Sequence, residues 1–349
     1  MSRPVSWQLR HRAARRRQIL HTVIICLIPL VLVAVVLLTL FEPIDSGAPA
    51  SSLPQSSAPS EPPSRPADAI PESSTPPSSE PSSEEVSDPL ADYGSVAREE
   101  ADLSVGDLII VNAENSYMDE PPGLVTVASA KTGDYMAKNY DIQLRDYVMP
   151  YLNEMMADFR AATGIGNVVI LSSYRSVEYQ KGLYEQDLKR TGRDYSDSVT
   201  KPGHSEHYTG LTFDLAYVAA DGSWPFYDGH GDYGWINENS WKYGFIIRYP
   251  EGKQEVTGII PEPWHFRFVG QAHAEIVTRS GLCYEEYMEM LHGHTAEDPY
   301  IFSGESGSWE VYYVPYTGGV IEVPVPKDHS YTISGSNEGG FIVTVDMNS

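Results

Sequence analysis

The length and spacing of apolar runs change several times along this chain, and these changes divide it into segments. Residues 23–41 read VIICLIPLVLVAVVLLTLF, a run of 19 residues without a charge. At about 1.5 Å per residue, a helix of this length spans the roughly 30 Å hydrocarbon core of a bilayer. A cleaved secretory signal is the competing interpretation, but its apolar region usually has only about 7–15 residues. The pattern therefore predicts an uncleaved transmembrane anchor helix over residues 18–41.

Residues 42–90 show the opposite pattern, because large apolar side chains almost disappear from them. Ser and Pro make up 25 of the 45 residues from 46 to 90, and seven others are acidic. Such a composition buries too little apolar surface to offset the entropy that folding costs. We therefore expect a disordered Ser/Pro/Glu-rich stalk between the anchor and whatever follows.

From residue 91 to about residue 295, short apolar runs and helical periodicities are mixed. Apolar residues from Leu144 to Phe159 recur at spacings of three and four, which predicts an amphipathic helix that Gly164 or Gly166 ends. Pro150 fits this helix only in its first turn. Further strands are expected at 168–171, 211–217, 244–248 and 264–269, and further helices at 176–190, 271–279 and 284–291. The order lacks regular βαβ alternation, so the pattern predicts an α+β fold, a small mixed or antiparallel sheet with flanking helices.

Residues 296–349 alternate β-forming residues with turns. Strands are expected at 309–315, 320–325, 331–334 and 341–345. About 50 residues are marginal for an independent hydrophobic core. We therefore predict a short β-rich C-terminal extension that packs on the preceding domain, and we find no catalytic motif in it.

The distribution of charge adds a topology and excludes one class of partner. The chain has 24 Lys and Arg against 48 Asp and Glu, a net charge of -24, which argues against nucleic acid as a partner. Residues 1–17 nevertheless contain six arginines and no acidic residue. By the positive-inside rule, this basic flank lies in the cytoplasm and everything after the anchor lies outside the cell. The two cysteines exclude a disulfide framework and a four-cysteine zinc site.

Two imidazoles and one carboxylate stand in a pattern suited to a catalytic metal. Side chains alternate along a strand, so Asp214 should project from the face opposite Phe213, where His207 of the preceding loop could meet it. About fifty residues later, Glu262 precedes His265 by three positions. His207, Asp214 and His265 would suffice as ligands of a catalytic zinc ion, whose fourth position is left for water. Glu262 is then the natural carboxylate to take the proton of that water.

This spacing alone is not specific, because a chain with ten histidines supplies some such combination. A hydrogen-bonded structural histidine remains the alternative for each member. An Fe(II) oxygenase site also uses two histidines and a carboxylate, but its usual close His-x-Asp spacing is absent. We expect Glu206 to be solvated, because adjacent side chains in an extended segment point in opposite directions. The histidines assigned to structural roles are His204, His230, His273, His292, His294 and His329.

Four motifs in a fixed order make the assignment specific. They are SSYRSVEYQ (172–180), PGHSEHYTGLTFD (202–214), YGFIIRYP (243–250) and EPWHFRFVG (262–270). Together they resemble the VanY-type D-alanyl-D-alanine carboxypeptidases, which belong to a wider group of zinc peptidases that includes lysostaphin-like enzymes. The resemblance covers roughly residues 91–291 and does not extend to the stalk or the C-terminal extension.

The resemblance implies roles for particular residues. The family's zinc ligands fall on His207, Asp214 and His265, and its general base falls on Glu262. Its substrate-contacting and oxyanion-stabilising arginine falls on Arg175. The positions that line the pocket for the terminal D-amino acid in similar enzymes fall on Gln180, Ser205 and Trp264. Departures from the family pattern, which bear on the pocket and spare the ligands and the base, are Thr212, Phe266 and Phe268.

The resemblance therefore implies an enzyme that uses one zinc ion to hydrolyse the terminal D-Ala-D-Ala bond of peptidoglycan stem peptides, and the apolar run 23–41 predicts that it is anchored in the membrane. An L,D-carboxypeptidase or a peptidoglycan endopeptidase with the same metal site is an alternative. A non-catalytic wall-binding module is less well supported, because all three ligands and the base are present. The aromatic-rich segment 224–241 could line a groove for a glycan or a peptide, although such segments more often serve packing.

Overall fold

The computed structural model describes residues 89–349, which fall within one compact unit. The predicted basic flank, the anchor helix and nearly all of the stalk lie outside the described residues. Among residues 89–349, no helix is long and apolar enough to cross a membrane.

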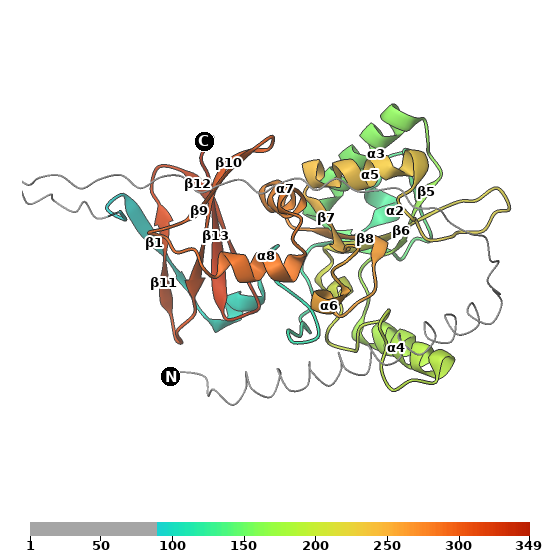
Figure 1. Cartoon of the computed structure of the whole chain (residues 1–349), viewed down its shortest axis with the longest axis horizontal. Coiled ribbons are helices and arrows are strands. Elements are labelled where there is room, and N and C mark those ends of the chain that lie inside the picture. The colour runs from blue at the N-terminus through green and yellow to red at the C-terminus, as the bar shows by residue number, and fades with distance from the viewer. Residues whose placement is uncertain (1–88) are drawn as a thin grey trace, which may run out of the picture. The chain divides into compact units, whose positions relative to one another are not determined.

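A five-stranded mixed sheet forms the centre of the domain (Figure 1). Its strand order is β3-β5-β6-β8-β7, with β3 parallel to β5 and the other neighbours antiparallel. The predicted α+β class is thereby confirmed. The strands are β3 (Met136–Ala137), β5 (Val168–Ser172), β6 (Thr212–Tyr217), β7 (Phe245–Tyr249) and β8 (Glu262–Phe268).

Helices lie on and around this sheet, and their ends follow from local sequence signals. Pro150 lies in the first turn of α3 (Met149–Thr163), and Gly164 ends that helix in the left-handed conformation with φ 75°. The Ser176 hydroxyl caps α4 (Val177–Thr191) by accepting a hydrogen bond from the Tyr179 backbone N–H. The end of α3 at Gly164 was predicted, and a helix was expected to begin near residue 176. The other α-helices of the described residues are α2 (Val127–Ala130), α5 (Gly234–Asn239), α6 (Gln254–Thr257), α7 (Gln271–Ser280) and α8 (Tyr284–Leu291).

The main hydrophobic core lies between the sheet and α3. The α3 stripe contributes Leu152, Met155 and Phe159, and β6 contributes Phe213 and Leu215, all buried. The alternation predicted for β6 therefore holds, because the apolar side chains enter the core while the Asp214 carboxylate lines a cavity. A small two-stranded sheet, β2 (Leu124–Thr126) and β4 (Gln143–Arg145), precedes α3.

The predicted β-rich extension packs on the domain through α7 and α8, as Figure 1 shows. Val311 and Ile342 of its sheet share a buried cluster with Ile276 of α7 and Tyr287 of α8. His273 of α7 bonds to both sides of this junction, with its ring nitrogens 2.5 Å from the Tyr287 hydroxyl and 2.8 Å from the Thr344 hydroxyl. The sheet has the order β12-β13-β10-β9, from β9 (Tyr300–Gly304), β10 (Gly307–Pro315), β12 (Ser330–Gly335) and β13 (Gly340–Asp346).

A second two-stranded sheet pairs the first described strand with a strand of the C-terminal extension. β1 (Tyr93–Arg98) runs antiparallel to β11 (Ile321–Pro326), with Tyr93 opposite Pro326 and Arg98 opposite Ile321. The sequence patterns predicted β11 but neither β1 nor this pairing. The first described strand therefore belongs structurally to the C-terminal extension.

Glu338, in the turn between β12 and β13, provides a pH-dependent contribution to stability. Burial, together with the negative charges of Glu289 and Glu285, raises the pKa of its carboxyl to about 7. Its one hydrogen bond among the described residues comes from the Asn115 amide at 3.4 Å, and His292 Nε2 lies 3.6 Å from its other oxygen. A carboxyl group with a raised pKa destabilises the folded state once it ionises.

We expect the free energy of unfolding to fall between pH 4.5 and about pH 7 because of this group. Glu338→Gln should match the wild type near pH 4.5 and exceed it by about 2 kcal/mol at pH 8, because it removes the ionisation. Urea unfolding at several pH values measures the difference. The exposed Glu297→Gln controls for the loss of one charge, and a pH-independent difference for Glu338→Gln would contradict the expectation.

Candidate metal centre and active site

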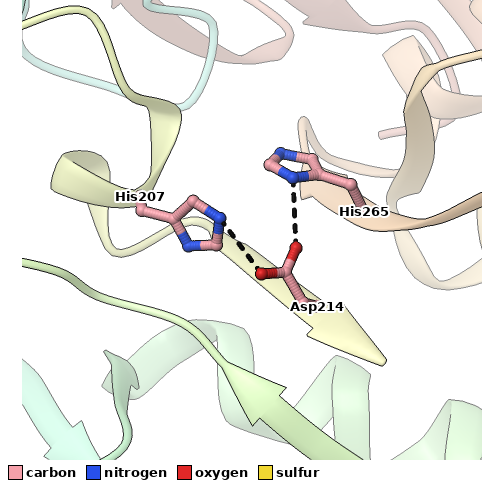
Figure 2. Close-up of side chains that lie close together, drawn as sticks. All are labelled: His207, Asp214 and His265. Atoms are coloured by element: carbon pink, nitrogen blue, oxygen red, sulfur yellow. Dashed lines mark ion pairs between the residues drawn. The ribbon is translucent and has the colours of Figure 1, made fainter. Parts of the chain in front are cut away.

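The three predicted ligands meet in one buried cluster (Figure 2). His207 comes from the 3-10 helix η3 (Glu206–Thr209), while Asp214 of β6 stands directly opposite His265 of β8 in the ladder. Nε2 of His207 lies 3.4 Å from one Asp214 oxygen, and Nδ1 of His265 lies 3.2 Å from the other. One ligand atom from each residue lies within 4.8 Å of the others, so the cluster has the dimensions of a mononuclear metal site.

The hydrogen bonds around His207 and Asp214 fit a bound cation. Nδ1 of His207 lies 2.6 Å from the Ser173 carbonyl oxygen, which can only accept. The proton of His207 is therefore on Nδ1, and the lone pair of Nε2 is directed at Asp214. Asp214 Oδ1 is buried without a hydrogen-bond partner among the described residues. An acceptor-only oxygen and a free imidazole lone pair at one point form a donor set suited to a divalent metal ion.

Electrostatics favour the protonation states that ligation needs at two of the three residues. Burial and the neighbouring Arg175 lower the pKa of His207 to about 4, so its imidazole is neutral at physiological pH. Burial alone would raise the pKa of Asp214, but the two histidines and Arg175 hold it well below its usual value. Burial alone would likewise lower the pKa of His265, but the nearby carboxylates of Asp214 and Glu206 raise it to about 9. A cation would therefore have to displace a proton from His265 alone.

Glu262, the predicted base, begins β8 and borders the same cavity. Its carboxylate lies 3.5 Å from Nδ1 of His265 and is buried. Burial, together with the nearby Asp214 charge, raises the pKa of Glu262 to about 7. A cation held by the three ligands would oppose this shift and favour the carboxylate form, which can accept a proton. The carboxylate is thus close to the ligands without belonging to the group of three.

Arg175 connects the ligands to the wall of the cavity. It donates to Asp214 at 2.7 Å, to the Ser172 hydroxyl at 2.9 Å and to the Gln180 side-chain carbonyl at 3.3 Å. Three hydrogen bonds hold the guanidinium at the edge of the site. It can therefore stabilise negative charge there without a large rearrangement of its side chain.

All of the residues predicted for the substrate pocket line one cavity of about 290 Å³ with the ligands and Glu262. Gln180 is buried, and its amide donates to the Thr200 carbonyl at 2.8 Å. Ser205 is also buried, immediately before η3. The ring of Trp264 packs on Phe226, with centroids 4.8 Å apart. The sequence identified these positions through the family resemblance, and their assigned roles remain predictions.

The aromatic-rich segment 224–241 contributes to the cavity mainly through Phe226. This residue is half exposed and, like Arg175, lines both the ligand cavity and a second cavity. By contrast, Tyr227, Trp235 and Trp241 contribute to hydrophobic clusters. Tyr249 also lines the ligand cavity and was missed. Its position beside the buried Arg248 in the motif YGFIIRYP was the available signal.

The prediction that Glu206 is solvated was wrong. Its side chain is fully buried, and its Oε1 accepts hydrogen bonds from Arg248 at 2.7 Å and from Arg267 at 2.8 Å. The argument from alternation failed because Glu206 opens a 3-10 helix instead of continuing an extended segment. The two arginines within apolar strands were a signal that a buried carboxylate had to be present.

Two histidines, a carboxylate and a separate buried carboxylate around one cavity define the site as that of a mononuclear metal hydrolase. Comparison with known proteins then identifies the family. The family model for VanY, D-alanyl-D-alanine carboxypeptidase, matches residues 141–271. A D-alanyl-D-alanine carboxypeptidase of Enterococcus faecium is 32% identical over 250 residues, which are 70% of this chain and 77% of the relative. The chain belongs to the VanY family of metallopeptidases.

Two further comparisons agree with this assignment. A D-alanyl-D-alanine carboxypeptidase of Enterococcus faecalis is 33% identical over 204 residues, covering 56% of this chain and 70% of the relative. Among solved structures, the vancomycin-resistance D,D-dipeptidase VanXYg, in complex with a D-Ala-D-Ala phosphinate analogue, is 31% identical with a TM-score of 0.65. That similarity covers 73% of this chain and 99% of the other. The fold and the family are therefore supported by sequence and structure together.

Proposed function

We propose that this protein is a zinc-dependent D,D-carboxypeptidase that removes the terminal D-alanine from peptidoglycan stem peptides. The observation that carries the proposal is the buried group of His207, Asp214 and His265 with Glu262 beside it, in a chain of the VanY family. The donor set of two imidazoles and one carboxylate is the one that catalytic zinc sites use. The alternative of a non-catalytic wall-binding module is disfavoured, because no ligand and no base is missing.

The residues of the cavity can divide the work of peptide hydrolysis among them. A zinc ion bound to the three ligands would act as a Lewis acid, polarising the scissile carbonyl group and acidifying water. Glu262 would accept the proton of the attacking water and deliver it to the leaving amine. Arg175 would stabilise the negative charge that develops on the carbonyl oxygen. Gln180, Ser205 and Trp264 would bind the terminal D-amino acid.

The test is the digestion of defined peptides by the full chain in detergent with added zinc. A pentapeptide that ends in D-Ala-D-Ala should lose one alanine, and mass spectrometry should detect the tetrapeptide. A tetrapeptide that ends in a single D-alanine tests L,D-carboxypeptidase activity, and a cross-linked dimer tests endopeptidase activity. Free D-Ala-D-Ala tests a dipeptidase, because the solved relative is a D,D-dipeptidase. Failure to cleave the pentapeptide while any of the others is cleaved would reject the proposed specificity.

Arg175 should contribute to the rate even where its charge is kept. We expect Arg175→Lys to lower kcat/KM about a hundredfold, because one ammonium nitrogen cannot replace the three guanidinium nitrogens that donate to Ser172, Gln180 and Asp214. Since Arg175 donates to the ligand Asp214, the zinc content of the variant must be measured beside its rate. The partly exposed Arg160→Lys is the matched control. An Arg175→Lys protein with full zinc content and an unchanged rate would contradict the assigned role.

The same proposal places the enzyme at the outer face of the cell membrane. It is supported by the uncharged run 23–41 and the six arginines of residues 1–17, and by peptidoglycan lying outside the membrane. Protease added to intact cells or protoplasts should digest the catalytic domain and spare a tag on the N-terminus. Protection of the domain until the cells are lysed would reject this placement.

A further inference from the structure

A group of four charged side chains, three of them buried, lies next to the candidate metal centre. Arg248 and Arg267 are fully buried, and Glu206 and Glu285 pair with them. Arg248 donates to both oxygens of Glu285, at 2.6 and 2.8 Å, and to Oε1 of Glu206. Two positive and two negative charges balance, so the group as a whole is neutral. Burying it is tolerated only because each charge has a partner.

One carboxylate oxygen of this group has no hydrogen-bond partner within the group, and it lies beside the predicted ligand His265. Both arginines donate to the same oxygen of Glu206, Oε1. Among residues 89–349, the other oxygen, Oε2, has no hydrogen-bond partner, and neither does Nε2 of His265. These two buried atoms lie 3.8 Å apart. Oε2 of Glu206 can accept a hydrogen bond from a ring N–H, and Nε2 of His265 can donate one when it carries a proton.

We propose that Glu206 is a positioning residue, which holds His265 in the tautomer that leaves Nδ1 free to bind the metal. A carboxylate can only accept, so Glu206 keeps a proton on Nε2 of His265 when a metal ion displaces the proton from Nδ1. The lone pair of Nδ1 is then directed at Asp214, 3.2 Å away, where the metal would bind. His207 is fixed in the complementary way, with its proton on Nδ1 toward the Ser173 carbonyl and its Nε2 free. The two ligands thus present different nitrogens because different acceptors lie behind them.

The arginines explain why a carboxylate and not an amide is needed at position 206. Arg248 and Arg267 require an acceptor at the position of Oε1, since both donate to it. In a Glu206→Gln protein the amide carbonyl would have to stay there, and the NH₂ group would face Nε2 of His265. Nε2 would then accept a hydrogen bond, and the imidazole proton would move to Nδ1, the nitrogen that must bind the metal. An isosteric change of one atom therefore selects the wrong tautomer.

The direct test is the zinc affinity of the metal-free full chain, measured by competition with a chromophoric chelator. We expect Glu206→Gln to bind zinc about 10–100-fold more weakly, the range typical of residues that orient metal-ligating histidines. The control is Glu275→Gln, which removes another fully buried carboxylate that accepts backbone N–H bonds from Glu305 and Ser306, in a cluster that contains no ligand. Both changes should lower the melting temperature, but only the first should lower the affinity. Equal affinities in Glu206→Gln and the wild type would overturn the proposal.

A measurement on the unchanged protein decides the question even if Glu206→Gln does not fold. In the zinc-loaded protein with ¹⁵N-labelled histidine, long-range proton–nitrogen NMR spectra report which ring nitrogen carries the proton. We expect a slowly exchanging Nε2–H on His265 and a proton on Nδ1 of His207. A proton on Nδ1 of His265, or a rapidly exchanging Nε2–H, would overturn the assignment.

This inference depends on the proposed function, because it takes His265 as a metal ligand, and the two can fail separately. A wild-type chain that binds no zinc and cleaves no peptide would reject the proposed function. A chain that binds zinc and releases D-alanine, but whose zinc affinity is insensitive to Glu206→Gln, would reject only the positioning role.

Discussion

Replacement of Glu262 by glutamine should lower kcat for D-alanine release about a thousandfold. Glutamine has the same shape but cannot take up the proton of water, and positioned acid–base groups contribute about 10²–10⁴ in rate. Zinc binding should be retained, because Glu262 lies outside the group of three ligands. Stopped assays that quantify free D-alanine, with zinc content measured in parallel, would separate the two effects.

The same substitution should not destabilise the protein. Since burial raises the pKa of Glu262 to about 7, this group lowers the stability of the metal-free chain as the pH rises from about 4.5 to 7. Glu262→Gln removes the ionisation, so the metal-free variant should melt no lower than the wild type at pH 8. Exposed Glu255→Gln serves as the control. A fully active Glu262→Gln protein would eliminate Glu262 as the base.

Asn in place of Asp214 should abolish both metal binding and activity. Asp214 contacts both ligand histidines and Arg175, so the change removes one ligand and the charge that holds the other groups together. The loss of zinc affinity should exceed the about 10–100-fold typical of residues that only orient ligands. Activity at stoichiometric zinc should fall to the background of the assay. Isothermal titration with zinc and release of D-alanine are the two measurements.

Two controls make this result specific to the metal. Asp187→Asn removes another buried aspartate, which pairs with Arg190 on α4, and should leave zinc affinity unchanged. Wild-type protein treated with a chelator should lose its activity and regain it when zinc is added. Full activity after exhaustive chelation, or in Asp214→Asn, would show that hydrolysis does not use this site.

The parts of the fold that could be predicted were those specified by neighbouring residues. Pro150, Gly164 and Ser176 fix the ends of two helices through local geometry, so a short stretch of sequence sufficed to place them. The pairing of β1 with β11 joins residues more than two hundred positions apart, and no local pattern specifies such a partner. β3 was missed for a different reason, since its two residues are too short to show a period.

The candidate site shows the same division between local and distant information. His207, Asp214 and His265 were found because each lies within a motif that is an unbroken stretch of sequence. The structure brings their ligand atoms together. The burial of Glu206 depends on arginines 42 and 61 positions away in the chain, which meet only after β7 and β8 pair with the rest of the sheet. Spacing on either side of Glu206 could not reveal these partners. A buried acid therefore looked like a solvated one.

The pairing of β1 with β11 also has a mechanical consequence. The described chain enters the folded body beside β11, where Asp92 accepts a hydrogen bond from the Lys327 backbone N–H and β1 pairs with β11. Tension applied from the N-terminal side would first be carried by these contacts. β11 and β1 share their apolar cluster with the C-terminal strands and not with β6 or β8. Force would therefore load the extension before it reached the strands that carry Asp214 and His265. The C-terminal extension would thus bear such a force before the strands of the metal centre do. Removing residues 296–349 would leave β1 without its partner strand.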